Sequence, residues 1–291
     1  MWRNFLSKFK PLPYDILNSI FVAFLLGLSA VFRHRLPNVG HLVCVYLGLL
    51  LMITLCSVLP ADFDKRISLI HFFYPLILVP IVFESLGNLI IYINLHFWDP
   101  TLARLDTLIC GVAPCVYLQR FIRPWLTEIL QLAYISYYFM PAILGIAFWC
   151  RKDKRLPSAI FTTLLGFYIS YIGYLLFPAL GPRFYLADPH CVYEHTFLAK
   201  QIAHCLNVLE HNKTDAFPSG HTQISLMCTY FAGYLGKKWA AIYAILTTLL
   251  IISTIYCRYH YLVDVIAGIL LAGICLKIAP KLEACLKRFG N

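Results

Sequence analysis

Two short runs in the C-terminal third of the chain combine residue types that suit phosphate chemistry. The first is AFPSGHT, from Ala216 to Thr222, in which a turn-forming Pro-Ser-Gly leads into an apolar helix. Gly220 allows close backbone approach, and the N–H groups at a helix N-terminus bind anions. Ser219 can donate its hydroxyl to a phosphate oxygen, and His221 can supply or accept a proton near pH 7. This run therefore predicts a phosphate-binding turn that carries an acid–base group.

The second run is CRYHYLVDVIAG, from Cys257 to Gly268. His260 and Asp264 are four residues apart, so a helix would place them one turn apart on the same face. A carboxylate bonded to one imidazole nitrogen fixes the tautomer and leaves the other nitrogen free to attack phosphorus. Arg258, just before His260, could neutralise the equatorial oxygens of the transition state. We expect a nucleophile, its orienting partner and a cation in this run.

The apolar segments around these runs predict that both histidines lie at the same membrane face. The chain crosses from Gly220 to about Leu235 and returns from Lys238 to about Tyr256, and each crossing spans roughly 25 Å at ~1.5 Å per residue. A third run, LFPALGPRF, ends the preceding apolar span and brings Arg183 to that face. Three helix ends are thus expected to meet there.

Composition indicates that these helices belong in a bilayer. Sixty per cent of the 291 residues are hydrophobic and 13% are charged, which is outside the usual range of soluble domains. Crossing a hydrocarbon core of roughly 30 Å takes about 20 apolar helical residues. We predict an all-α, polytopic transmembrane bundle of about eight spans, with a range of about six to eight. The candidate spans are approximately 15–32, 41–59, 70–95, 130–150, 158–179, 220–236, 239–256 and 262–279.

The charge distribution predicts the orientation of the bundle. The formal net charge is +10, and a basic membrane protein more often concentrates such an excess in cytoplasmic loops than on a nucleic-acid surface. With the N-terminus inside, 15 of the 24 Lys and Arg lie on the cytoplasmic face, although Arg33 and Arg35 fit poorly. The other face carries nine, of which seven are Arg, the residue suited to phosphate. We expect a multi-pass protein of the cell or inner membrane, with its active site on the non-cytoplasmic face and no nucleic-acid partner.

No repeat or linker divides the chain, so one integral membrane domain is expected. Within it, residues 1–130 would form N-terminal membrane helices and an interfacial segment, and residues 131–291 a catalytic, phosphatase-type helical core. Two longer segments, at about 96–128 and 181–219, interrupt the spans on the Arg-bearing face. The first suits a helix that lies in the interface or dips partway in.

The two chemical runs resemble those of the type 2 phosphatidic acid phosphatase superfamily, and within it the branch similar to inositol phosphorylceramide synthases. Pro218 to His221 match the family's PSGH element, and His260 with Asp264 match the HxxxD of its last element. The resemblance implies that His260 is the nucleophile that becomes phosphorylated, Asp264 its orienting partner, and His221 the acid that protonates the leaving group. It also implies a phosphate held by Ser219, the Gly220 amide, Arg183 and Arg258.

The chain departs from the family pattern in its first and last elements. A Lys usually stands seven residues before an Arg-Pro pair, but here Leu176 holds that position and Phe184 follows Arg183. The family usually has an Arg six residues before the nucleophile, but here that position is Thr254. Arg258 is expected to take over the task of the missing Arg. These departures favour the synthase-like branch over the plain phosphatase pattern. The resemblance is strongest over residues 158–275.

The function implied is that of an integral membrane lipid phosphate phosphatase or head-group phosphotransferase, acting through a phosphohistidine on a membrane lipid phosphoester. Water as acceptor gives a phosphatase, and an alcohol acceptor gives a transferase with the same catalytic residues. No cofactor is needed, because arginines and amide dipoles can stabilise the charge. The rival interpretation is a non-catalytic lipid-phosphate transporter or binding protein that keeps the phosphate cradle.

Polar residues outside the two runs leave other possibilities. Their spacing in the second long segment matches no standard metal-ligand pattern, so no metal site is predicted there; the residues weighed are Asp188, His190, His195, His204 and His211. Cys191 and Cys205 share that segment and would form a disulfide only if that face is oxidising. Glu84 and Asn88 form a polar pair within the third span, which points to the bundle interior or to a substrate path.

Overall fold

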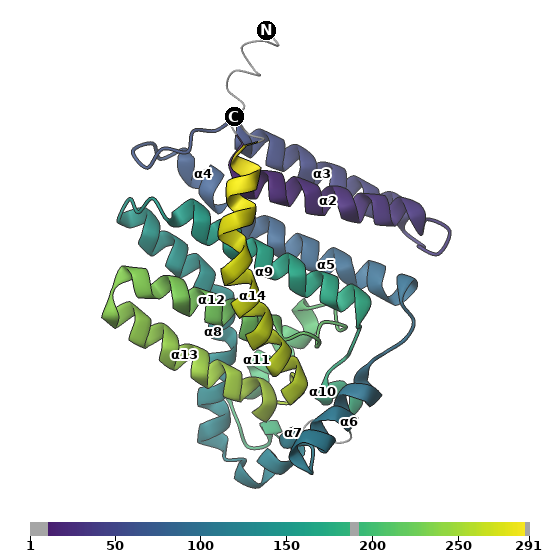
Figure 1. Ribbon diagram of the computed structural model, residues 1–291. Coiled ribbons are helices and arrows are strands. Elements are labelled where there is room, and N and C mark those ends of the chain that lie inside the picture. Colours follow the sequence, from purple (N-terminus) through teal and green to yellow (C-terminus); the bar gives the residue numbers. More distant parts are fainter. Residues whose placement is uncertain (1–10, 187–191, 289–291) are drawn as a thin grey trace.

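A computed structural model describes residues 11–186 and 192–288 (Figure 1). The regular structure of these residues is helical, apart from an isolated bridge between Ala179 and Asp215, so the predicted all-α class is confirmed. The elements are α2 (Pro13–Val31), α3 (Val39–Ser57), α4 (Ser68–Phe73), α5 (Pro75–Ile93), α6 (Asp99–Cys110), α7 (Pro114–Tyr117), η1 (Leu118–Phe121), α8 (Pro124–Cys150), α9 (Leu156–Leu176), α10 (Pro182–Tyr185), α11 (Leu198–Leu209), α12 (Gly220–Ala232), η3 (Gly233–Leu235), α13 (Lys237–Tyr256) and α14 (Leu262–Lys287).

Seven helical segments in the described part of the chain are long and apolar enough to cross a membrane. The segment Ser68–Ile93 counts as one of them and contains α4 and α5. The count rises to 8 if α6 and the α7–η1 segment, bent by 66° at their junction, are taken together as one span. Both numbers lie within the predicted range, and the bent pair occupies the segment for which we expected an interfacial or partly inserted helix.

Helix α12 is the predicted span that fails this test, and its surroundings explain why. It has 13 residues, and η3 extends it by 3, which gives roughly 24 Å at ~1.5 Å per residue. Ten of its residues are buried, including Thr222, Gln223 and Ser225, because α8, α9, α13 and α14 surround it. A helix enclosed by protein needs neither the length nor the apolar composition of one that faces lipid.

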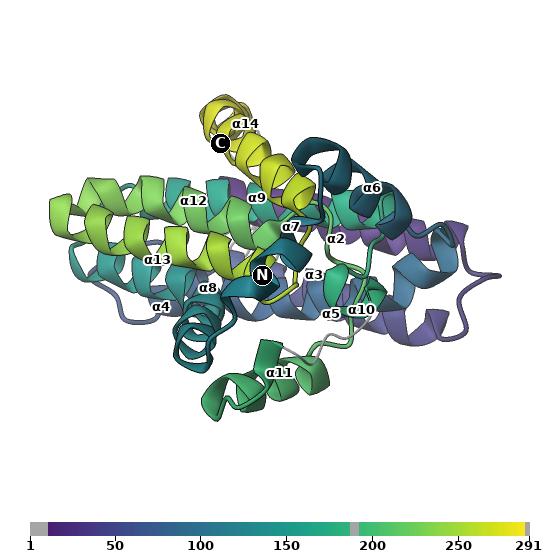
Figure 2. The same cartoon turned by 90° about the horizontal axis from the view of Figure 1, so that it is seen from below.

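The N-terminal helices pack on one side of this helical core. Helix α2 contacts α3, α9 and α14, and α5 contacts α9. Helix α11 lies on the outside of the bundle beside α8 (Figure 2). The division at residue 130 remains a prediction; that residue falls inside α8, which begins at Pro124.

Two aspartates of α6 connect the segments that carry the predicted site residues. The Asp99 carboxylate accepts hydrogen bonds from the backbone N–H groups of Leu180 and Gly181, both at 2.9 Å, and from the Tyr261 hydroxyl at 3.0 Å. It is 1% exposed. The turn that leads to Arg183 is therefore anchored to the residue that precedes α14.

Asp106, two turns further along α6, caps α14 from outside the helix. Its two carboxylate oxygens accept the backbone N–H groups of Leu262 and Val263, each at 2.9 Å. A negative charge at a helix N-terminus satisfies donors that have no partner within the helix and interacts favourably with the helix dipole. Figure 2 shows α6 beside this end of α14. The interfacial segment thus fixes the start of the helix that carries Asp264.

Replacing Asp106 by Ala should destabilise the protein measurably. Two N–H groups of α14 would lose their acceptor, and the loss of such a cap costs about 1–2 kcal/mol. We expect a lower thermal unfolding midpoint in detergent micelles for Asp106→Ala than for wild type. Thr101→Ala, at an exposed position of the same helix, should leave the midpoint unchanged, and equal midpoints for the two variants would contradict the capping role.

Candidate active site

The two histidines singled out from the sequence meet in the structure. His260 follows α13, and His221 lies in the first turn of α12. The distance between His260 Nε2 and His221 Nδ1 is 3.2 Å, and the two side chains belong to residues that are only 2% and 6% exposed. The expected convergence of the two imidazoles is confirmed.

A backbone carbonyl determines which nitrogen of His260 is free to react. The Nδ1 atom lies 2.7 Å from the Ala216 carbonyl oxygen. Because a carbonyl can only accept, His260 Nδ1 carries the proton and Nε2 presents a lone pair. The Nδ1–H group of His221 then donates to that lone pair. His221 Nε2 is left unprotonated, and this buried atom has no hydrogen-bond partner among the described residues.

Asp264 lies beside His260 but is not its main hydrogen-bond partner. Asp264 Oδ2 is 3.5 Å from His260 Nδ1, whereas it accepts the Tyr261 backbone N–H at 2.8 Å. The direct carboxylate–imidazole hydrogen bond expected from the i, i+4 spacing is therefore replaced by the Ala216 carbonyl, because His260 precedes α14 rather than lying on it. The role of Asp264 as orienting partner remains a prediction.

Ser219 and Gly220 are engaged in assembling the site. The Ser219 hydroxyl caps α12: it accepts the Thr222 backbone N–H at 3.3 Å and donates to the Thr222 hydroxyl at 3.1 Å. The Ser219 N–H donates to the Asp264 carbonyl at 3.0 Å, which joins the two sequence runs. A Cβ at Gly220 would come within 2.5 Å of the Tyr174 hydroxyl oxygen, so the close approach of α9 requires glycine there. Contact of these two residues with phosphate remains a prediction.

The side chains of the two predicted arginines have different neighbours. The Arg183 guanidinium stacks on the Tyr259 ring, 4.7 Å from its centroid, and lies 3.5 Å from Glu210 Oε2. The Arg258 side chain is buried and lies against Gln119 of η1. The backbone joins the two residues, since the Arg183 N–H donates to the Arg258 carbonyl at 2.8 Å. Of the two, Arg183 is the arginine whose charge acts on His260.

Aromatic rings enclose His221 on two sides. Its imidazole stacks on Tyr134 with ring centroids 4.5 Å apart and packs against Tyr137 at 4.2 Å. Both tyrosines belong to α8. Two tyrosines of this helix therefore pack directly against a predicted catalytic side chain.

Two acidic residues that the sequence reasoning missed lie in the same site. Glu210 accepts a hydrogen bond from the Tyr138 hydroxyl and forms the ion pair with Arg183. Burial raises the pKa of Asp215 to about 6, and the nearby Glu210 carboxylate adds to the rise. Asp215 directly precedes the AFPSGHT run, and this position could have indicated that it belongs to the site. Glu210 had none, because its neighbours come from distant segments.

Burial has the opposite effect on His260. It lowers the pKa of this imidazole to about 4, although the charge of Asp215 and the hydrogen bond to Ala216 partly counteract it. His260 is therefore neutral near pH 7, with an unprotonated Nε2. A neutral imidazole with a free lone pair is the form that can attack phosphorus.

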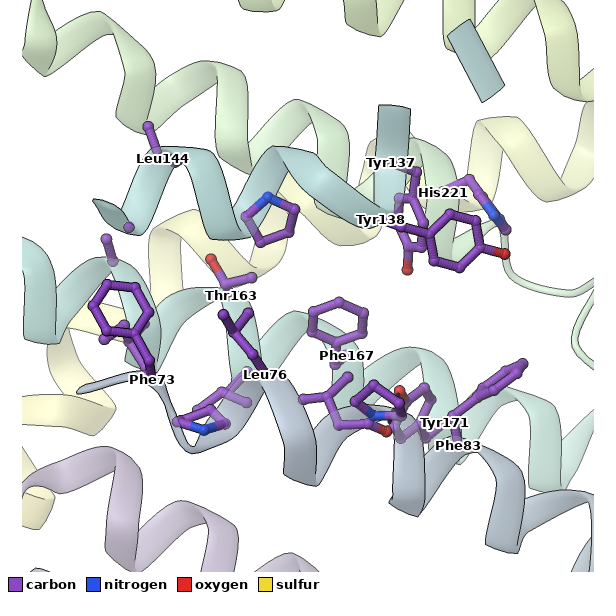
Figure 3. A pocket seen from close by; sticks show the side chains of 18 of the residues that line it. Phe73, Leu76, Phe83, Tyr137, Tyr138, Leu144, Thr163, Phe167, Tyr171 and His221 are labelled. Atoms are coloured by element: carbon purple, nitrogen blue, oxygen red, sulfur yellow. Dashed lines mark hydrogen bonds between the residues drawn. The ribbon is translucent and has the colours of Figure 1, made fainter. Parts of the chain in front are cut away.

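A cavity of about 440 Å³ opens beside His221. Figure 3 shows His221, Tyr137 and Tyr138 at one end of it and Leu144 and Phe73 towards the other. Asp215 and Glu210 also line it. The site therefore joins a polar end, which carries titratable groups, to a long apolar space.

The predicted absence of a metal and the possible disulfide are only partly covered by the structure. Among residues 11–186 and 192–288, no group of three or more His, Cys, Asp or Glu side chains has a metal-binding arrangement. Asp188, His190 and Cys191 lie outside the described residues. The Cys191–Cys205 pairing therefore remains open.

Comparisons with known proteins agree with this site. A model of the PAP2 superfamily matches residues 102–278, which include all seven predicted site residues. A PA-phosphatase related-family protein of Dictyostelium discoideum is 29% identical over 178 residues, covering 54% of this chain and 32% of that protein. The chain thus aligns with about a third of that relative's length. No solved structure matches the chain.

Stability between pH 4 and pH 6 should reveal the two opposite pKa shifts. The folded-state pKa of His260 lies below its unfolded value of about 6.5, so its contribution increases stability as pH rises through this window. The raised pKa of Asp215 decreases stability over the same range. Relative to wild type, thermal unfolding midpoints of His260→Asn should fall with rising pH, and those of Asp215→Asn should rise.

The slopes should correspond to no more than about 1.4 kcal/mol per pH unit for each group, which is the linkage of one proton. His204→Asn, at an exposed position of α11, serves as the control and should follow wild type. Parallel midpoint curves for all four proteins would show that neither group titrates in this window.

Proposed function

Because the chain belongs to the PAP2 superfamily, we propose that it is an integral membrane enzyme that transfers the phosphoryl group of a lipid phosphate through a phosphohistidine on His260. The observation that carries this proposal is the position of His260 Nε2, whose lone pair faces His221 Nδ1 at 3.2 Å. A nucleophile and a proton donor lie together, buried at the ends of membrane helices. The family supports a phosphatase-type activity; the intermediate and the lipid substrate are our proposal.

In the first step the phosphate group takes the place of the hydrogen bond between the two imidazoles. His260 Nε2 attacks phosphorus in line, forming the N–P bond while the ester P–O bond breaks. A phosphate monoester has a pKa near 6, so it can bring the proton that His221 Nε2 accepts. The resulting imidazolium donates its Nδ1 proton to the leaving oxygen, and the lipid alcohol departs neutral.

In the second step an acceptor hydroxyl attacks the phosphohistidine. His221 now carries its proton on Nε2, so its Nδ1 can accept the proton of the acceptor. The N–P bond breaks and His260 Nε2 regains its lone pair. The His221 imidazolium returns its Nε2 proton to the product phosphate and keeps the proton on Nδ1, which restores the starting state. Water as acceptor releases inorganic phosphate, whereas an alcohol yields a new phosphate ester.

Arg183 and the start of α12 are the groups we assign to charge stabilisation. The N-terminal end of α12 carries the positive end of the helix dipole next to His221. Arg183 is held in place by the Tyr259 ring and by Glu210. A phosphate would compete with the Glu210 carboxylate for this guanidinium. The 3.5 Å contact with Glu210 Oε2 is long, so a shorter charge-assisted pair with phosphate favours the exchange.

The orientation of the molecule in its membrane also belongs to this proposal. The basic clusters 151–155 and Lys237–Lys238 lie at the helix ends opposite the two histidines, because α8, α9, α12 and α13 each cross the bundle between them. Lys65–Arg66 lies on the same side, because the neighbouring Asp64 pairs with Lys152. Basic loops favour the cytoplasmic side. We therefore place the active site on the non-cytoplasmic face of a cell or inner membrane.

The acceptor separates two versions of the function. The departures of the first and last elements from the plain phosphatase pattern support the transferase, in the branch similar to inositol phosphorylceramide synthases. The Dictyostelium relative, described as PA-phosphatase related, supports hydrolysis. A non-catalytic lipid-phosphate transporter would keep the cradle but would need no unprotonated nitrogen at His260.

Trapping the phosphoenzyme tests the proposal. Full-length protein in detergent is mixed with phosphatidate carrying labelled phosphorus, quenched rapidly in alkali and assayed for acid-labile label on protein. We expect label in wild type and in the exposed-residue control His204→Gln, and none in His260→Gln. Turnover of His221→Gln should fall about 10²–10⁴-fold, the usual contribution of a positioned proton donor.

A chase with water alone or with added inositol or glycerol then identifies the acceptor from the product. Turnover without label at His260, or equal turnover in wild type and His260→Gln, would overturn the proposed intermediate. Retention of lipid-phosphate binding with no turnover in any protein would favour the transporter.

A further inference from the structure

The cavity beside His221 has one polar end and one apolar end. Apart from tyrosines, the titratable residues that line it are Glu84, Glu210, Asp215 and His221. Glu84 lies at the polar end, because its carboxylate accepts the backbone N–H of His211 at 3.1 Å, and His211 directly follows Glu210. The rest of the lining comes mainly from apolar side chains of α4, α5, α8, α9 and α11, with Thr163 as an exception. A ligand that matches this space has a single charged head and an apolar tail.

The length of the cavity fits one leaflet of a bilayer. Along α8 it reaches from Tyr137, next to His221, to Gly145 and Phe148. These stretches correspond to roughly 12 Å and 16 Å at ~1.5 Å per residue. Half of a hydrocarbon core of roughly 30 Å is about 15 Å. A lipid whose phosphate lies at the histidines could therefore place a chain in this cavity over the full depth of its leaflet.

Two residues close the far end. The Phe73 ring lies there (Figure 3), where it packs edge-on against Trp149 with ring centroids 6.5 Å apart. Opposite it, Gly145 of α8 has no side chain, and a Cβ at this position would come within 3.0 Å of Phe73 Cε1. Any larger residue at 145 would fill the end of the cavity, and a smaller residue at 73 would extend it.

We propose that this cavity takes one acyl chain of the lipid phosphate substrate and that Gly145 and Phe73 set the chain length the enzyme prefers. The proposal rests on the proposed function for the position of the phosphate. Three features support the assignment of an acyl chain to this cavity: its apolar lining, its continuity with His221, and a length that matches one leaflet. We assign one chain to the cavity, and the second chain of a diacyl lipid would stay in the bilayer. The two residues act on specificity and not on the reacting atoms.

The kinetic test compares kcat/KM for a series of saturated lipid phosphates that differ only in chain length. Each methylene that loses its place in the cavity should lower kcat/KM about fourfold, the effect of leaving one CH₂ unburied. Gly145→Leu should shift the optimum to shorter chains, and Phe73→Ala should shift it to longer ones. Gly273→Leu is the matched control, because nothing lies within 4 Å of a Cβ at that exposed position of α14, and its profile should match wild type.

Opposite shifts cannot result from a general loss of stability, which would lower all rates together. Unchanged profiles in both Gly145→Leu and Phe73→Ala would overturn the proposal while leaving the phosphatase activity in place. The kinetic test requires turnover, so a binding measurement that does not depend on turnover accompanies it.

Binding is measured by quenching of Trp149 fluorescence with a lipid phosphate brominated near the end of its chain. All proteins in this measurement carry His260→Gln, so that the lipid is not hydrolysed, and the detergent contains no bromine. The Trp149 signal is the difference in fluorescence between this protein and one that also carries Trp149→Phe. We expect quenching by chain-end bromine that exceeds quenching by bromine near the head group, and its loss in Gly145→Leu. Quenching without turnover in wild type would refute the proposed function and retain the chain site, whereas turnover without such quenching would refute the chain site.

Discussion

The hydrogen bond between His260 Nδ1 and the Ala216 carbonyl, 2.7 Å long, determines the chemistry available to this protein. It requires a proton on Nδ1 and so leaves Nε2 as an unprotonated nitrogen facing His221. The bond exists only because the PSGH turn and the segment after α13 lie against each other. Backbone contacts hold them there: Ser219 N–H to the Asp264 carbonyl, and Arg183 N–H to the Arg258 carbonyl. The carboxylates of Asp99 and Asp106 attach the same segments to α6.

Much of this arrangement could be predicted from the sequence, because apolar length and motif position are local properties. Runs of about 20 apolar residues predicted most of the spans, and helix reversal between Gly220 and Tyr256 predicted that the two histidines share one membrane face. The same reasoning overestimated α12, since hydrophobicity does not reveal that a helix is surrounded by protein and can be short and polar. The interfacial segment was recognised, but its function as an anchor for α14 was not.

The remaining features depend on contacts between distant residues. The i, i+4 spacing placed Asp264 near His260 but did not reveal that a closer acceptor, the Ala216 carbonyl, comes from 44 residues earlier in the chain. Glu210 and Asp215 gain their importance from burial beside Arg183 and the imidazoles, which no local pattern indicates. The same holds for the apolar cavity, whose walls come from α4, α5, α8, α9 and α11. Sequence spacing thus predicted that the two histidines meet. Packing between distant segments determines their tautomers and the shape of the cavity beside them.

A crystal structure with orthovanadate would show directly whether His260 is the nucleophile, because vanadate adopts the five-coordinate geometry of a phosphoryl group in transfer. We expect vanadium bonded to His260 Nε2, with the imidazole hydrogen bond broken and His221 Nδ1 directed at the opposite apical oxygen. His260 Nδ1 should keep its bond to the Ala216 carbonyl. Vanadate bound elsewhere, or bound while the two imidazoles still contact each other, would contradict the account.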